Sequence, residues 1–222
     1  MSTMLREIGI DEAGRGPVIG SLFVAGVLNF EGLEVLGVRD SKRLSSKRRE
    51  QLAKLIVDAT EVQVVELTAK EIDERRKSQS MNEITVDLFA RIIELLHPDR
   101  VYVDAADVNP ERFAYNLRKK CKCRCKCNMR KRDIEIISEF KADVNYPVVS
   151  AASIVAKVHR DRSIRELATE IGTEIGSGYP ADPRTIQFLK RLLDDRKDKN
   201  SIPAYVRQSW KTFERLCSNS ML

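Results

Sequence analysis

Two apolar segments near the N-terminus enclose a short stretch of acidic and turn-forming residues. Residues 5–11 and 21–28 each have the length and apolar content of a buried strand, and DEAGRGPVIG runs from the last residue of the first to the start of the second. Because glycine and proline favour turns, the two strands are expected to pair with each other. The fold therefore begins with a strand pair whose connection carries two carboxylates, Asp11 and Glu12, beside backbone that lacks bulky side chains.

Strands and helices alternate after this opening pair. The predicted strands are residues 62–67, 100–104 and 133–140. The predicted helices, where apolar residues recur every three to four positions, are residues 47–60, 81–96 and 109–120. From residue 148 onward the pattern predicts helices without further strands. We expect an α/β fold with a central five-stranded mixed sheet in residues 1–147 and a helical C-terminal region in residues 148–222.

Composition limits the possible partners only loosely. With 222 residues, 42% of them hydrophobic, the chain can bury a core, and its net charge of +6 suggests a polyanionic partner without establishing one. No apolar stretch approaches the roughly 20 residues that cross a bilayer, and the N-terminus lacks the apolar region of a signal peptide. We expect a soluble, cytoplasmic monomer.

Four of the five cysteines lie in the basic tract KKCKCRCKCNMRKR, at Cys121, Cys123, Cys125 and Cys127. Thiols this close in the chain cannot link distant parts of a fold, and the odd total favours a reducing compartment. An extended tract would place all four thiols on one side, where they could bind Zn²⁺, but structural zinc sites usually combine two separate cysteine pairs. We interpret the tract as a solvated basic loop that contacts a nucleic-acid backbone nonspecifically.

Acidic residues stand at the ends of several predicted elements. They are Asp11, Glu12, Asp104 and Asp143. Carboxylates within about 4 Å repel by roughly 4 kcal/mol per pair at an effective dielectric near 20, so a cluster of them needs cations. Hard oxygen donors without nearby histidine or cysteine favour Mg²⁺ or Mn²⁺. On spacing alone, Asp107 and Asp133 are equal candidates for metal ligands. A single aspartate at the end of a strand is also more often a turn former or a helix cap than a ligand.

Five motifs follow one another along the chain: GIDEAGRGPVIG, RDSKRLSSKRRE, VDAAD, KAD..YPVVSAASIVAKV.RDR and GSGYP.DP.T..FL. Together, from about Ile8 to Trp210, they resemble ribonuclease HII. The resemblance implies a ribonuclease H-like fold whose C-terminal helical region completes the active site. It also implies an endonuclease that hydrolyses RNA in RNA/DNA hybrids and cuts duplex DNA on the 5′ side of an embedded ribonucleotide.

The resemblance assigns the catalytic residues one by one. The four acidic residues of the family fall on Asp11, Glu12, Asp104 and Asp143. They would hold two divalent ions, Mg²⁺ or Mn²⁺, with Asp11 between the two, and the products would carry a 3′-hydroxyl and a 5′-phosphate. Glu12 would serve the second ion.

Substrate contacts follow from the same resemblance. The backbone of Gly14, Arg15 and Gly16 would read the 2′-hydroxyl of the ribonucleotide, since glycine lets backbone approach a sugar closely. Tyr179 would pack on the deoxyribose of the next nucleotide. Without the other motifs, GRGP would be interpreted as a tight turn and Tyr179 as a loop anchor. The remaining predicted contacts are Lys42, Lys47, Ser150 and Lys157, and Ser153 shares a helical stripe with the last two.

Three departures and three alternatives accompany this prediction. Phe140 stands where relatives often carry histidine, the cysteine tract has no counterpart, and FERLCSNSML lacks the aromatic pair of a sliding-clamp binding sequence, so we expect no clamp partner. The alternatives are a noncatalytic hybrid-binding module, a DNA resolvase and a ribonuclease HIII. The intact carboxylates disfavour the binding module, and the GRG motif with its tyrosine disfavours the resolvase. The position of Asp11 so near Met1 disfavours ribonuclease HIII.

Overall fold

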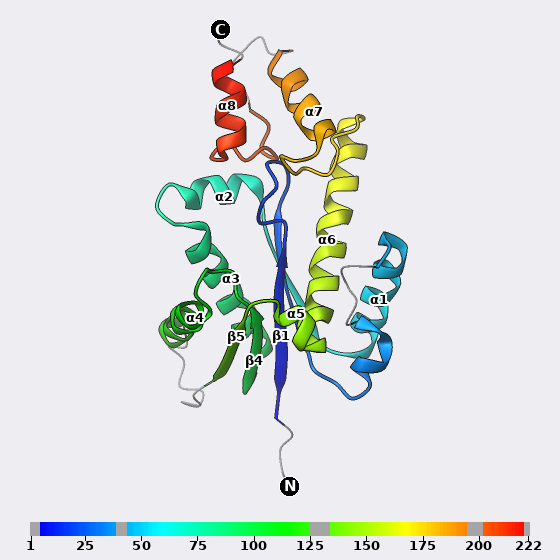
Figure 1. Ribbon diagram of the computed structural model, residues 1–222, viewed down its shortest axis with the longest axis vertical. Coiled ribbons are helices and arrows are strands. Elements are labelled where there is room, and N and C mark those ends of the chain that lie inside the picture. The colour runs from blue at the N-terminus through cyan, green and yellow to red at the C-terminus, as the bar shows by residue number, and fades with distance from the viewer. Residues whose placement is uncertain (1–4, 39–43, 125–133, 195–201, 220–222) are drawn as a thin grey trace. The chain divides into compact units, whose positions relative to one another are not determined.

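The computed structural model describes residues 5–38, 44–124, 134–194 and 202–219 (Figure 1). The chain divides into two compact units by its internal contacts. The first comprises Met1–Ala13, Phe23–Val65 and Ser80–Val158, and the second comprises Gly14–Leu22, Glu66–Gln79 and His159–Leu222. The predicted boundary between residues 147 and 148 stays a prediction.

A five-stranded mixed sheet forms the centre of the first unit, as the sequence predicts. Its strands are β1 (Glu7–Ala13), β2 (Leu22–Leu28), β3 (Val62–Leu67), β4 (Arg100–Asp104) and β5 (Glu135–Glu139), in the order β3-β2-β1-β4-β5. Strand β1 pairs antiparallel with β2 and parallel with β4, and β4 pairs parallel with β5. The opening strand pair is thus a confirmed prediction, and β1 lies at the middle of the sheet.

The helices match the predicted ones and add shorter elements. They are α1 (Ser46–Ala59), α2 (Ala69–Arg76), α3 (Met81–Leu96), α4 (Pro110–Arg124), α5 (Ala142–Asn145), α6 (Pro147–Ile171), α7 (Pro183–Asp194) and α8 (Lys211–Asn219), with a 3-10 helix, η1 (Leu33–Leu36). Capping boxes begin α2 at Thr68 and α3 at Ser80, because each N-cap hydroxyl and a glutamate three residues later satisfy each other's backbone N–H groups.

Two glycines bring helices directly against the sheet. A Cβ on Gly9 of β1 would lie 2.3 Å from the carbonyl carbon of Val148 in α6, and a Cβ on Gly26 of β2 would lie 2.2 Å from Cγ2 of Ile92 in α3. Because side chains alternate along a strand and Gly26 pairs with Ile10, these contacts are on opposite faces. Figure 1 shows α6 and α1 on one side of β1, and α3 and α4 on the other.

The second unit has its own apolar core. Buried side chains from the segment after the GRG motif, the later part of α6, α7 and α8 pack together there. They include Ile19, Ile164, Phe188, Val206 and Phe213. In the parts of the chain that the structure describes, no helix is long and apolar enough to cross a membrane.

The cysteine tract differs from its interpretation as a solvated loop where it is described. Helix α4 continues to Arg124 and so includes Cys121 and Cys123. Cys121 is a buried thiol on the apolar side of this helix. Cys125 and Cys127 are outside the described residues, so the zinc and loop interpretations of that part stay predictions.

Candidate active site

Asp11 and Asp104 occupy neighbouring positions on adjacent parallel strands. Ile10 of β1 pairs with Val103 of β4, so the next residue of each strand is one of these aspartates. Neighbouring strands lie about 4.8 Å apart and paired residues project to the same face. Burial raises the pKa of Asp11 to about 6, and the charge of Asp104 acts in the same direction. The sheet therefore gathers two of the predicted carboxylates.

Helix α6 supplies polar groups that stabilise the ionised form of Asp11. Ser153, which is fully buried, hydrogen-bonds its carboxylate, and Lys157 donates from Nζ to Oγ of Ser153 over 2.7 Å. The N–H of Glu12 donates to Oδ1 of Asp11 over 2.7 Å. The hydrogen bonds and the charge of Lys157 lower the pKa of Asp11 and partly offset its burial. Ser153 was missing from the predicted site residues, although its spacing of four from Lys157 was the signal.

A sharp turn after β5 brings Asp143 toward Asp104. Lys141 adopts a left-handed conformation with φ of 56°, and α5 begins directly after it. The N–H of Ala142 donates to Oδ1 of Asp104 over 3.2 Å, so Asp143 is the residue next to this contact. Asp143 is 4% exposed. Three predicted carboxylates thus belong to adjoining elements of the first unit.

Glu12 differs from these three carboxylates in the direction of its Cα–Cβ bond. It follows Asp11 on β1, so its Cβ projects from the other face of the sheet. Among the described residues, no three carboxylate, histidine or cysteine side chains converge closely enough to hold an ion as they stand. The donor chemistry nevertheless fits Mg²⁺ or Mn²⁺, because Asp11 and Asp104 offer hard oxygens side by side and a cation would offset their repulsion. A third carboxylate would have to rotate toward it.

Of the two alternative aspartates, the structure describes only Asp107, and an arginine already neutralises it. Asp107 forms an ion pair with Arg112, which also donates from Nε to Oδ2 over 3.0 Å. This contact lowers the pKa of Asp107 to about 2, so its carboxylate already has a cation. Asp133 lies outside the described residues.

The GRG motif, Gly14 to Gly16, forms a turn in the second unit that depends on glycine. Gly14 has φ of 94°, and a Cβ there would lie 2.6 Å from the carbonyl oxygen of Ser21. A Cβ on Gly16 would lie 3.6 Å from the ring of Tyr179. Two separate predicted substrate contacts, the GRG backbone and the tyrosine, are therefore neighbours within one unit.

Backbone hydrogen bonds join the tyrosine loop to the segment that follows the GRG motif. The N–H groups of Val18 and Ile19 donate to the carbonyl oxygen of Gly178 over 2.8 and 3.2 Å. The guanidinium carbon of Arg160 lies 4.7 Å from the centroid of the Tyr179 ring. This cation–π contact holds a side chain that is 38% exposed.

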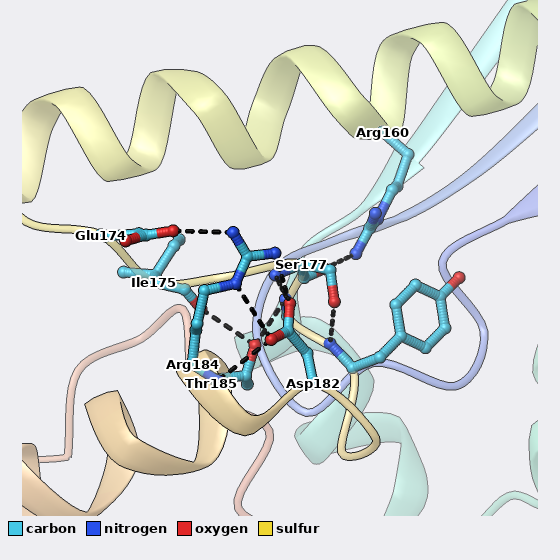
Figure 2. A network of polar contacts seen from close by, with 9 residues as sticks. Arg160, Glu174, Ile175, Ser177, Asp182, Arg184 and Thr185 are labelled. Carbon is cyan, nitrogen blue, oxygen red and sulfur yellow. Dashed lines mark hydrogen bonds and ion pairs between the residues drawn. The ribbon is translucent and has the colours of Figure 1, made fainter. Parts of the chain in front are cut away.

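A network of polar side chains also fixes the loop that carries Tyr179 (Figure 2). Asp182 accepts from the N–H of Ser177 over 2.7 Å, and Thr185 accepts from the N–H of Gly178 over 2.9 Å. Arg184 hydrogen-bonds Asp182 and holds the pKa of that carboxyl well below its ordinary value. The DP and T positions of the fifth motif thus preorganise the loop that carries Tyr179.

The remaining predicted contacts vary in accessibility. Lys47 is exposed in the first turn of α1, and Lys157 is half-buried against Ser153. Ser150 is fully buried and its hydroxyl donates to the carbonyl oxygen of Val38, a geometry that favours an anchoring role. Lys42 lies outside the described residues. Phe140 is 55% exposed, two residues after Ser138 of β5.

Comparisons with known proteins agree with one another. The family model described as Ribonuclease HII matches residues 8–213. The Ribonuclease HII of Methanosarcina barkeri (strain Fusaro / DSM 804) is 51% identical over 213 residues, which are 94% of this chain and 93% of the relative. The crystal structure of ribonuclease H2 from Pyrococcus horikoshii OT3 is 40% identical with a TM-score of 0.85, covering 98% of this chain and 99% of that one.

A further solved structure corrects one expectation. It is the PCNA:RNase HII complex from Archaeoglobus fulgidus, in which the matched chain is 42% identical with a TM-score of 0.82, covering 93% of this chain and 96% of that one. A similar protein therefore does assemble with the clamp PCNA, and our expectation of no clamp partner was wrong. The absence of an aromatic pair in one short sequence window was therefore too narrow a criterion for excluding a clamp.

Proposed function

The chain belongs to the ribonuclease HII family and is a ribonuclease H; we propose that it hydrolyses RNA in RNA/DNA hybrids and cuts duplex DNA on the 5′ side of an embedded ribonucleotide. The observation that carries the proposal is that Asp11 and Asp104 directly follow the paired residues Ile10 and Val103 on adjacent strands, where the charge of Asp104 acts on Asp11. A buried carboxylate, Asp11, beside the second carboxylate of Asp104 is costly in a domain that has no use for the pair.

We assign Asp11, Glu12, Asp104 and Asp143 as ligands of two divalent ions, Mg²⁺ or Mn²⁺. When bound, such ions activate a water and stabilise the leaving 3′ oxygen, which leaves 3′-hydroxyl and 5′-phosphate ends. The chain's own contribution is to keep Asp11 ionised at neutral pH. Ser153 and Lys157 do so by lowering the pKa that burial raises.

Substrate selection belongs to the GRG turn and Tyr179 in this proposal. The turn brings backbone without side chains to the sugar, where a 2′-hydroxyl can be hydrogen-bonded, and the exposed side chain of Tyr179 can pack on the next sugar. Lys42, Lys47 and Lys157 would contact phosphates. The two functions are linked by the chain itself, since a single residue separates Glu12 from Gly14.

The test is cleavage of an end-labelled DNA duplex that contains one ribonucleotide, with Mg²⁺, Mn²⁺ or EDTA, by the wild type and by Asp104→Asn. We expect a metal-dependent cut on the 5′ side of the ribonucleotide that the variant loses by at least about 10³-fold. Cutting of continuous RNA/DNA hybrids alone would remove the sugar-reading part of the proposal. Equal activity of Asp104→Asn would remove the carboxylate assignment.

The corrected partner extends the proposal to PCNA. A relative that covers nearly the same length was solved with PCNA, so we include a clamp among the partners of this chain. Size-exclusion chromatography with purified PCNA from Archaeoglobus fulgidus should show co-elution. Separate elution at concentrations of about 50 μM, well above ordinary transient affinities, would argue against the partner.

A further inference from the structure

Arg207 is a buried cation that donates hydrogen bonds to three backbone carbonyls between Gly14 and Gly20, two of them in the GRG turn. Its side chain is fully buried. Nε donates to the carbonyl oxygen of Gly20 over 2.8 Å, Nη1 to that of Arg15 over 3.1 Å and Nη2 to that of Gly14 over 2.6 Å. Removing a guanidinium from water costs several kcal/mol, so an arginine persists there only with such partners. The desolvation also lowers the pKa of Arg207, to about 9.

Trp210 holds the third residue of the same motif. Its indole Nε1 donates to the carbonyl oxygen of Gly16 over 3.2 Å, and its ring lies 4.8 Å from the guanidinium carbon of Arg207. The carbonyl groups of Gly14, Arg15 and Gly16 therefore all accept hydrogen bonds from two side chains of one short segment.

This segment is itself anchored on both sides. Asp73 of α2 accepts from the N–H of Gln208 over 2.7 Å, and from the N–H and hydroxyl of Ser209 over 3.1 and 2.7 Å. The N–H of Arg207 donates to the carbonyl oxygen of Val18 over 2.9 Å. All of these residues belong to the second unit. Arg207 and Trp210 are thus fixed before they touch the GRG motif.

Peptide geometry turns this anchoring into an orientation. None of the described peptide bonds is cis, and in a trans peptide the N–H points away from the carbonyl oxygen of the same unit. The carbonyl of Gly14 shares its peptide with the N–H of Arg15, and that of Arg15 shares its peptide with the N–H of Gly16. A side chain that binds the two carbonyls on one side therefore sets both N–H groups on the other.

We propose that Arg207, assisted by Trp210, is a positioning residue that orients the GRG backbone so that its N–H groups read the 2′-hydroxyl of the ribonucleotide. The inference rests on the proposed function. A lysine cannot replace Arg207, because its three donors radiate from a single nitrogen and cannot reach three carbonyls along a planar fork.

The experiment measures binding in Mg²⁺ on the Asp104→Asn background, where we expect cleavage to be lost. The readout is the ratio of Kd for an all-DNA duplex to Kd for the same duplex with one ribonucleotide. We expect Arg207→Lys to lower this ratio by about tenfold, the effect of losing well-aligned hydrogen bonds to one hydroxyl, and to leave Kd for the all-DNA duplex unchanged within about twofold. An unchanged ratio in a folded Arg207→Lys variant would overturn the inference.

Two further variants keep the result interpretable. Phe213→Leu trims the core of the same unit without touching the motif, so it should lower the melting temperature and leave the ratio unchanged. Trp210→Phe keeps a ring and removes the donor to Gly16, and it should lower the ratio by about threefold. If Arg207→Lys does not fold, Trp210→Phe is the deciding variant. A wild-type Kd ratio for Trp210→Phe would then overturn the inference. A parent protein with no preference for the ribonucleotide would instead refute the proposed function.

Discussion

The ammonium group of Lys157 donates a hydrogen bond to the hydroxyl of Ser153, one turn earlier on α6, over 2.7 Å. Ser153 in turn hydrogen-bonds Asp11 on β1, so three side chains form a line from the helix to the centre of the sheet. Burial raises the pKa of Asp11, whereas Ser153 and Lys157 lower it. The balance between them makes the ionisation of Asp11 sensitive to small changes.

Ser153→Ala should move the acidic limb of the pH profile of kcat/KM to higher pH. The hydroxyl lowers the pKa of Asp11, so its loss leaves burial and Asp104 less opposed and the pKa rises above about 6. The matched control is Ser150→Ala, which also removes a buried hydroxyl from α6 but one that hydrogen-bonds Val38. A shift of equal size in both variants would contradict the specific contact.

Asp11→Asn should abolish cleavage and yet stabilise the fold above about pH 6 in metal-free buffer. The folded pKa of about 6 exceeds the ordinary value of 3.8, so the folded state binds more protons between these values and stability falls as pH rises through this window. The loss is on the order of 3 kcal/mol, and the asparagine variant escapes it. Urea unfolding between about pH 4 and pH 8 measures the difference.

Asp107→Asn should change the stability of the fold in the opposite direction to Asp11→Asn. Arg112 lowers the pKa of Asp107, so its ionised form stabilises the fold at neutral pH and this contribution is lost only as the pH falls below about 4. The variant should therefore be less stable than the wild type at pH 7. A gain in stability for both aspartate variants would show that the two environments are not distinct.

Gly26→Ala should destabilise the first unit by about 1–3 kcal/mol through overpacking. Its Cβ would lie 2.2 Å from Cγ2 of Ile92 and 2.9 Å from Cδ1 of Leu96 on α3. Shortening the partner should relieve the clash, so Gly26→Ala combined with Ile92→Ala is expected to lose less than the sum of the single variants. Additive losses of stability in thermal unfolding would show that the clash with Ile92 is not the cause.

Tyr179→Phe should keep cleavage at an embedded ribonucleotide within about twofold, whereas Tyr179→Ala should lower kcat/KM by about tenfold or more, as expected for loss of ring stacking. The ring lies beside Gly16 and near Arg160, and neither contact requires the hydroxyl. Steady-state kinetics on one duplex separates the two variants. Equal losses would point to the hydroxyl rather than the ring face.

Parts of the fold with strong local signals were predictable from the sequence. The bounds of α3, β3 and β4 are as predicted, since α3 combines a capping box with a continuous buried stripe. Helix α2 escaped prediction because only Ala69 and Ile72 of its eight residues are buried. Helix α5 is a single turn, shorter than any window in which periodicity can be recognised.

The site divides in the same way. Asp11 and Asp104 were recognisable at strand positions, but their side-by-side placement depends on the register of β1 and β4, which no local pattern contains. Neither Trp210 nor Arg207 was singled out as a site residue, because a lone arginine gives no sign of burial until distant carbonyls surround it. The roles assigned to the four carboxylates and to Tyr179 stay predictions.

Gly9 makes the contact between β1 and α6 a contact of backbone with backbone, since a Cβ there would lie 2.3 to 2.5 Å from atoms of Val148 and Val149. A library that randomises this position should return glycine alone, whereas positions 8 and 10 should accept other aliphatic residues. Anyone who redesigns the chain for another substrate must therefore treat position 9 as invariant, although it contacts no substrate in the proposed function. The spacing between the strand of Asp11 and the helix of Ser153 is set there by the absence of a side chain.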